Sequence, residues 1–72
     1  MFKIGEFSKL TQVSIRMLRY YDEVGLLKPD KVDPFTDYRL YSARQIPRLN
    51  QIRFLRDLGF GISEITEALA QW

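Results

Sequence analysis

The chain contains neither cysteine nor histidine. It can therefore form no disulfide, and it lacks the two commonest soft metal ligands. The absence of histidine also removes the usual general base, which excludes a Ser-His or Cys-His catalyst. The carboxylates are scattered and form no obvious acid–base pair. We expect no enzyme activity, no metal site and no cofactor.

Long apolar runs are also missing. No segment is suited to span a membrane, and the N-terminal MFKIGEF lacks the apolar run of a signal peptide. These absences favour a cytoplasmic protein. The 72 residues, 46% of them hydrophobic and 14% aromatic, suffice for one small folded domain. Because so short a chain buries only about 60% of its unfolded surface, we expect a stability of a few kcal/mol.

Acidic residues are absent from one long stretch of the chain. Five arginines and no acid lie between Arg39 and Arg56, whereas Asp57, Glu64 and Glu67 follow with no base. The net charge of +2 hides this asymmetry. A solvated helix face would also show such charges, but the pattern favours one surface that faces a polyanion.

The segment 14–27, SIRMLRYYDEVGLL, has the features of a short amphipathic helix. Ser14 is a suitable N-cap, because its hydroxyl can accept from an orphan backbone N–H. Gly25 suits the left-handed residue that ends a helix, and Leu26 suits the hydrophobic contact that follows.

The periodicity of this segment separates an apolar side from a polar side. The apolar side holds Met17, Leu18 and Tyr21, with Ile15 and Val24 at its edges, and the opposite side holds Arg16, Arg19, Tyr20 and Glu23. Arginine can direct two donors at a guanine edge or a phosphate, and tyrosine hydroxyls commonly donate to phosphates. The polar side therefore suits a nucleic acid.

A second short helix is predicted before this one, from about Ile4 to Leu10. The turn Thr11–Val13 joins the two helices, as in a helix-turn-helix whose second helix reads DNA. After Pro29, which blocks helix continuation, the segments 31–32 and 38–41 favour strands around a turn-rich loop. We predict a two-stranded β-hairpin, or wing, packed on the helices.

Two more helices are predicted in the second half. A tight turn with a capping box at Ser42–Gln45 leads into a helix from about Ile46 to Leu58, which Gly59 ends. Its apolar residues recur every three positions, so it should contact several partners. The last helix runs from about Ile62 to the end, with Gly61 as its N-cap. Trp72 could fold back onto the core, but we favour a chain that continues beyond it.

This order of elements strongly resembles the N-terminal domain of the MerR family, the mercury-resistance-type transcriptional regulators. The matching stretches are KIGEFSKLTQVSIRMLRYYDEVGLL, DYRLYS and QIPRLNQIRFLRDLGFGISEI, which cover nearly the whole chain. The resemblance implies a mainly α winged helix-turn-helix over residues 1–72, with about four helices and the small two-stranded wing. It departs from the family where Asp37 replaces a common glycine and Gly61 a common serine.

The resemblance also implies which residues bind DNA. The second helix should enter the major groove, the wing should touch phosphates, and the loop between the last two helices should act as a second wing. The residues that match these positions are Ser14, Ile15, Arg16, Arg19, Tyr20, Tyr38, Arg39, Tyr41, Arg53, Arg56, Gly59 and Phe60. Tyr21 matches a mostly structural position.

Members of this family bind pseudo-palindromic promoter sites as dimers and distort the DNA so that RNA polymerase can use the promoter. The dimerisation helix and the effector region of the family are absent from these 72 residues. We therefore expect double-stranded DNA as the partner, a homodimer only in a longer protein, and RNA polymerase as an indirect partner through promoter DNA.

Two other functions fit the same residues. A small excisionase shares the outline and bends DNA for recombination. Alternatively, the helix-turn-helix face could dock a protein. Salt dependence separates this last case, because an apolar interface responds little to salt and a DNA interface responds steeply.

Overall fold

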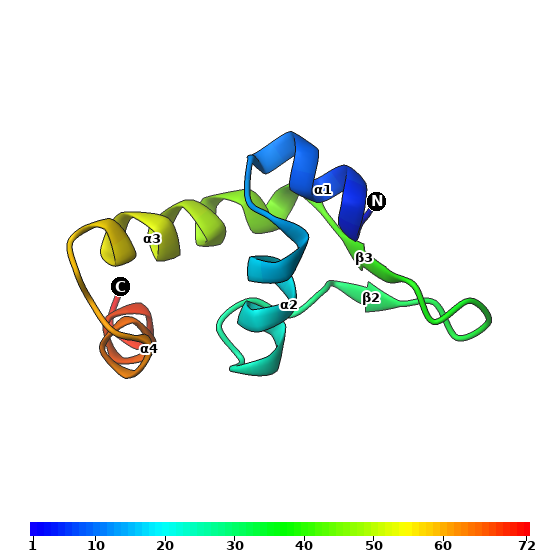
Figure 1. The fold of residues 1–72 in the computed structure, drawn as a ribbon. Helices are drawn as coiled ribbons and strands as arrows, with labels where there is room; N and C mark the ends of the chain where they lie inside the picture. Colours follow the sequence, from blue (N-terminus) through cyan, green and yellow to red (C-terminus); the bar gives the residue numbers. More distant parts are fainter.

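Four α-helices and a small antiparallel sheet make up residues 1–72 in the computed structural model (Figure 1). The elements follow in the order β1 (Phe2–Lys3), α1 (Ile4–Thr11), α2 (Ile15–Glu23), β2 (Lys31–Val32), β3 (Arg39–Tyr41), a 3₁₀ turn η1 (Ala43–Gln45), α3 (Ile46–Asp57) and α4 (Ile62–Ala70). The hairpin loop between β2 and β3 projects away from the helices (Figure 1).

The turn between α1 and α2 depends on two local features. Gln12 ends α1 in the left-handed conformation, with φ of 61°. The Ser14 hydroxyl then accepts a hydrogen bond from the Met17 N–H at 3.1 Å, which confirms Ser14 as the N-cap of α2. These features turn the chain sharply between the two helices.

The end of α2 is also as predicted. Gly25 has φ of 81°, and its N–H donates to the Asp22 carbonyl at 3.1 Å. The Leu26 N–H donates to the Tyr21 carbonyl at 2.9 Å, and the Leu26 side chain is buried. This pair of bonds is the Schellman motif, which satisfies carbonyls at the end of the helix.

The predicted sides of α2 are confirmed. Leu18 and Tyr21 are buried, and Met17 packs against the same core. The core consists of twelve apolar or aromatic residues and contains no charged group. It fixes which side of α2 faces solvent.

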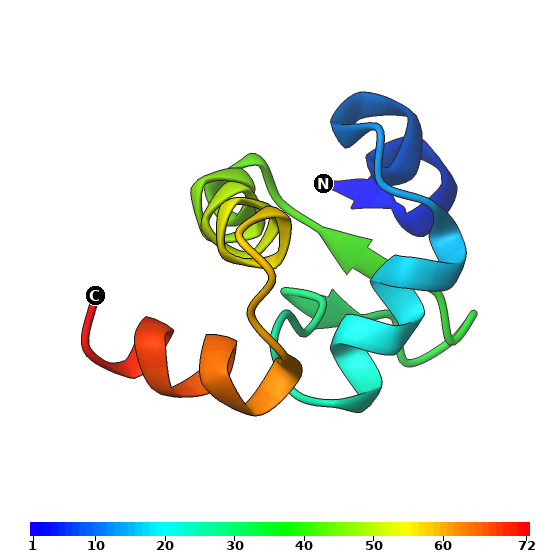
Figure 2. The same cartoon turned by 60° about the vertical axis from the view of Figure 1, so that its left-hand side comes forward.

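The sheet differs from the predicted two-stranded hairpin, because it has a third strand. Its order is β1-β3-β2, with Phe2 opposite Tyr41 and Lys3 opposite Leu40. Strand β1 has only two residues, so it shows no alternation that the sequence could reveal. In Figure 2, where α3 is seen nearly end-on, the sheet lies between α3 and the α1–α2 pair.

Helix α3 begins and ends close to the predicted residues. The Gln45 side chain accepts from the Ser42 N–H at 3.0 Å, Pro47 lies in the first turn, and Gly59 has φ of 95° after the helix. The three central residues of its apolar stripe are buried, but the last, Leu58, is exposed.

Helix α4 begins at Ile62, with Gly61 as its N-cap as predicted. The Gly61 N–H donates to Glu64 Oε1 at 2.9 Å. Ile65 and Leu69 are buried on its inner side. Trp72 is 64% exposed, so it does not fold back into the core. None of the helices is long and apolar enough to cross a membrane.

Candidate nucleic-acid interface

The outward side of α2 presents the predicted reading residues together. Arg16, Arg19 and Tyr20 are exposed on it, and Ile15 is 40% exposed at its start. Burial of Leu18 and Tyr21 on the other side holds this orientation. Ser14 lies at the N-terminal end of this surface, with its hydroxyl oxygen accepting from the backbone.

The arginines of α2 are free of ion pairs. The three ion pairs of the protein join Asp22 to Lys28 and Arg39, and Asp30 to Arg44. No carboxylate therefore lies within 4.0 Å of the Arg16 or Arg19 guanidinium. Their five N–H donors can meet an external acceptor without first breaking an internal salt bridge.

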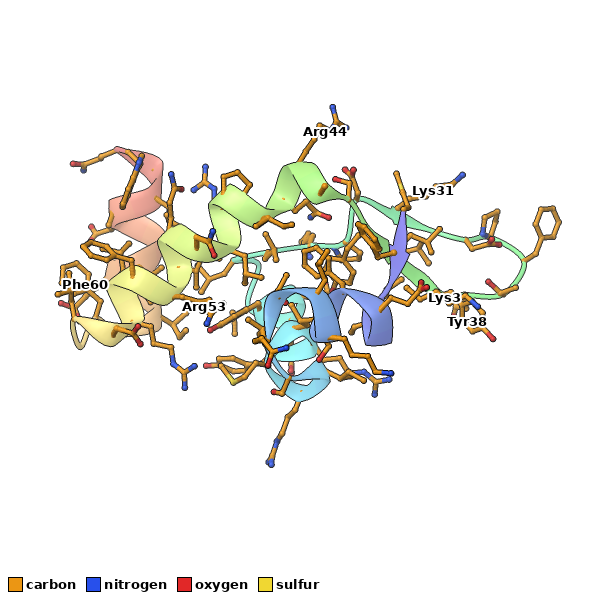
Figure 3. The ribbon with its side chains drawn as sticks, turned by 90° about the horizontal axis from the view of Figure 1, so that it is seen from above. Lys3, Lys31, Tyr38, Arg44, Arg53 and Phe60 are labelled. Atoms are coloured by element: carbon orange, nitrogen blue, oxygen red, sulfur yellow. The ribbon has the colours of Figure 1, made fainter.

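The base of the hairpin brings a second group of polar side chains to the surface. Tyr38 is 51% exposed, and the Lys3 ammonium lies 4.7 Å from the centre of its ring (Figure 3). Such a cation–π contact limits the orientations of the phenol. The Tyr38 hydroxyl keeps its donor for an external oxygen.

Arg39 connects the hairpin to α2. Its Nε lies 2.9 Å from Asp22 Oδ2, and Lys28 Nζ lies 3.6 Å from Asp22 Oδ1. The Nε–H donates to Asp22, whereas the terminal nitrogens of the guanidinium donate no hydrogen bond within the protein. Arg39 is therefore anchored through one donor and can present others.

Tyr41 does not belong to this surface, which corrects the expectation that it contacts DNA. Its side chain is fully buried, and its ring stacks on Phe7 with centroids 4.7 Å apart. Pairing with Phe2 across the unpredicted strand β1 covers it. Burial raises the pKa of the Tyr41 phenol, and the nearby Asp22 charge adds to the increase.

The buried Tyr41 hydroxyl has no hydrogen-bond partner, and neither does the neighbouring Ser42 hydroxyl. Two unpartnered buried hydroxyls lower stability relative to paired ones. The stacked ring of Tyr41 thus contributes to the core through packing and not through its polar atom.

The turn between α3 and α4, matching the second wing, lies at the far end of α3 (Figure 3). Phe60 is partly exposed there after Gly59, and Arg56 is exposed on the last turn of the helix. Arg53 has a structural contact in addition, because its Nη1 donates to the Thr11 carbonyl at 2.8 Å. This bond ties α3 to the turn of the helix-turn-helix.

The hairpin tip is a hydrogen-bonded turn. Asp33 Oδ1 accepts from the N–H groups of Phe35 and Thr36 at 2.8 and 3.2 Å, and these bonds lower the pKa of its carboxyl group. Asp37 has φ of 64°, as expected where the family often has glycine. The turn leaves Phe35 95% exposed.

Sequence reasoning gave no role to Lys3, Lys9 or Asp22. The structure places Lys3 against Tyr38 and Asp22 against Arg39, and it leaves Lys9 exposed on α1. Lys3 and Lys9 stand outside the arginine-rich stretch that drew attention to the second half of the chain. Asp22 was assigned to no role, because its partner Arg39 is 17 residues away. The pairing of β1 with β3 was the missing signal for Lys3.

A helix-turn-helix with unpaired arginines on its second helix, followed by a β-hairpin, is the arrangement of winged helix-turn-helix DNA-binding domains. The comparison with protein families gives the particular group. The chain matches the MerR HTH family of regulatory proteins over residues 2–72, and it belongs to that family. Its relatives are transcriptional regulators and not enzymes.

Two curated relatives illustrate the similarity. The chain is 46% identical over 67 residues to the multidrug-efflux transporter 1 regulator of Bacillus subtilis (strain 168), covering 93% of this chain and 24% of that protein. It is 45% identical over 69 residues to the HTH-type transcriptional regulator HmrR of Sinorhizobium medicae (strain WSM419), covering 96% of this chain and 46% of that protein. The chain thus spans less than half of either relative.

Solved structures confirm the winged helix-turn-helix fold. The N-terminal part of the Bacillus subtilis multidrug transporter activator, MtaN, matches with a TM-score of 0.85 and 38% identity, over 96% of this chain and 64% of that one. The EcmrR–DNA complex in EcmrR-RPo matches with a TM-score of 0.86 and 45% identity, over 90% of this chain and 24% of that one.

Proposed function

We propose that this chain is the sequence-reading, double-stranded DNA-binding part of a transcriptional regulator. The observation that carries the proposal is the outward side of α2, where Arg16 and Arg19 are exposed and unpaired beside Tyr20. A helix of this width fits the major groove, where arginine distinguishes guanine by its O6 and N7 acceptors. DNA as the partner implies a cytoplasmic site of action.

The remaining site residues supply position and affinity. Ser14 and Ile15 lie at the N-terminal end of α2, and Tyr38 and Arg39 lie at the base of the hairpin. From these positions they can meet the sugar–phosphate backbone next to the reading helix. Gly59 and Phe60 form the second wing in this proposal, with Arg53 and Arg56 nearby on α3. Phosphate contacts fix the register of the protein on the duplex and give most of the affinity.

We further propose that a longer protein containing this domain acts as a homodimer. The regulator would bind a pseudo-palindromic promoter site, distort it, and affect RNA polymerase through the DNA. Support comes from the family, and from the structural relative EcmrR, whose structure is that of a DNA complex. Two copies on a two-fold site bind far more tightly than one, so the isolated chain should bind weakly.

Selection of bound duplexes from a random DNA pool, at two salt concentrations, tests the function. We expect enrichment of a short motif and an affinity that falls steeply with salt, by about one power of ten per tenfold salt for each phosphate contact. A protein-docking domain would enrich no motif. Binding that ignores salt would contradict the proposed DNA interface.

A further inference from the structure

A groove of about 510 Å³ lies beside α2, and it is lined by predicted site residues together with residues of α1 to which the sequence gave no role. Three elements enclose it: the first turns of α1, the start of α2 at Ile15, and the base of the hairpin at Tyr38 and Arg39. In a helix-turn-helix the N-terminal end of the second helix approaches the bases. A groove at that end therefore lies where a DNA backbone passes.

The rim of the groove is positively charged. Lys3, Lys9 and Arg39 line it, against a single acid, Glu6. Glu6 is occupied as a cap, because its Oε1 accepts from the Lys3 backbone N–H at 2.8 Å. Neither lysine ammonium has a carboxylate within 4.0 Å, so both charges are available to an external anion.

The floor of the groove is apolar. Gly5 has no side chain there, and a Cβ placed on it would meet Ile15 Cδ1 at 4.0 Å. Ile4 and Ile15 supply the apolar surface. A cationic rim over an apolar floor matches a deoxyribose with its phosphate, because the sugar packs on carbon while the phosphate meets ammonium groups.

We propose that this groove seats one sugar–phosphate step of duplex DNA, next to the bases that α2 reads. Lys3 and Lys9 are its phosphate ligands, and Lys3 also orients the Tyr38 phenol through the 4.7 Å contact with its ring. Helix α1 is then a DNA-contacting element and not only a support for α2. This inference rests on the proposed DNA-binding function.

Matched lysine variants test whether the groove binds the DNA backbone. Lys3→Gln and Lys9→Gln each remove one positive charge from the rim of the groove. The control, Lys31→Gln, also removes one positive charge, but from the other side of the molecule. There Lys31 and Arg44 point away from α1 and α2 (Figure 3). In 0.1 M salt, each rim variant should bind a duplex about eightfold more weakly and lower the salt slope by about 0.9, since each phosphate contact contributes that power of salt. Lys31→Gln should bind like the parent chain. Equal effects of all three variants would overturn the proposal.

A change of side-chain volume distinguishes binding of DNA inside the groove from a general attraction between the positive charges and DNA. Gly5→Met places a side chain in the part of the groove next to Ile15 without altering any charge, and methionine is a better helix former than glycine. We expect a similar loss of affinity with an unchanged or higher melting temperature. Unchanged affinity in a folded Gly5→Met variant would show that no backbone enters the groove.

A duplex with one neutral methylphosphonate at successive positions locates the phosphate. At one position the parent chain should lose affinity while Lys9→Gln should lose none, because that contact is already gone. If no position behaves in this way, the proposal that the groove binds a backbone phosphate is contradicted. Saturable binding of a free deoxynucleoside monophosphate at the groove would show a small-anion site in its place and overturn the backbone assignment.

The failure of this inference is distinguishable from that of the proposed function. Suppose that the parent chain binds duplex DNA with an affinity that depends on Arg19, but the rim and Gly5 variants behave like Lys31→Gln. Then only the proposal that the groove binds the DNA backbone is wrong. If the parent chain binds no DNA at low salt, both proposals fail.

Discussion

The Nε of Arg39 lies 2.9 Å from Oδ2 of Asp22, which joins the base of the hairpin to the last turn of α2. The Asp22 side chain is largely covered, so this pair is less screened than a typical surface pair. The contact fixes the hairpin relative to α2. If both elements touch one duplex, this relationship sets the spacing of their contacts.

Asp22→Asn should therefore weaken DNA binding, by about 0.5–1 kcal/mol, an estimate based on the value of partly exposed ion pairs. The direction of the change in affinity is informative, because removal of a negative charge near DNA would by itself strengthen binding. Fluorescence anisotropy on one duplex measures the change, with Asp30→Asn as the control, since Asp30 pairs with Arg44 at 3.7 Å. Tighter binding of Asp22→Asn would contradict a positioning role.

Arg39→Ala removes the proposed phosphate contact of the wing. We expect weaker binding to all sequences alike and a salt slope lower by about one unit, as for a lost phosphate contact. Binding to the selected motif and to a scrambled duplex, each over a salt series, measures both effects. A loss confined to one sequence would contradict a phosphate-contacting wing.

Leu18→Ala tests the rotation of α2. Leu18 is fully buried in the apolar core, so the substitution should lower the free energy of unfolding by about 2–5 kcal/mol. In a domain this small, that loss leaves a substantial unfolded fraction, which circular dichroism would detect. An unchanged melting curve would show that Leu18 does not face the core.

The local features of α2 were predictable, whereas the tertiary ones were not. Ser14 and Gly25 act within four residues of their partners, so the sequence determined both ends of the helix. Tyr41 was expected at the DNA-binding surface because the family resemblance matches it to the wing, beside Tyr38 and Arg39. Its burial depends on β1, a two-residue strand whose pairing with β3 spans almost forty residues and has no local signal.

The hairpin tip should respond to acid. Hydrogen bonds from the Phe35 and Thr36 N–H groups lower the pKa of Asp33 from its ordinary value near 3.8, so the ionised form is favoured in the folded state. A lowered pKa stabilises the turn above about pH 4, and the contribution is lost as the pH falls through the folded pKa. Amide chemical shifts of Phe35 and Thr36, followed from pH 6 to pH 2, measure the change. Asp33→Asn should abolish this titration, and its persistence in that variant would assign it to another group.

The central claim is that the outward side of α2 reads the DNA sequence. The most direct measurement is the ratio of affinities for the selected motif and a scrambled duplex, in the parent chain, Arg19→Ala and the control Arg44→Ala. We predict that Arg19→Ala weakens binding to the motif by about 1–3 kcal/mol and lowers the ratio, because a bidentate base contact is lost. Arg44, which points away from α1 and α2, should leave the ratio unchanged. An unaltered ratio in Arg19→Ala would contradict the account.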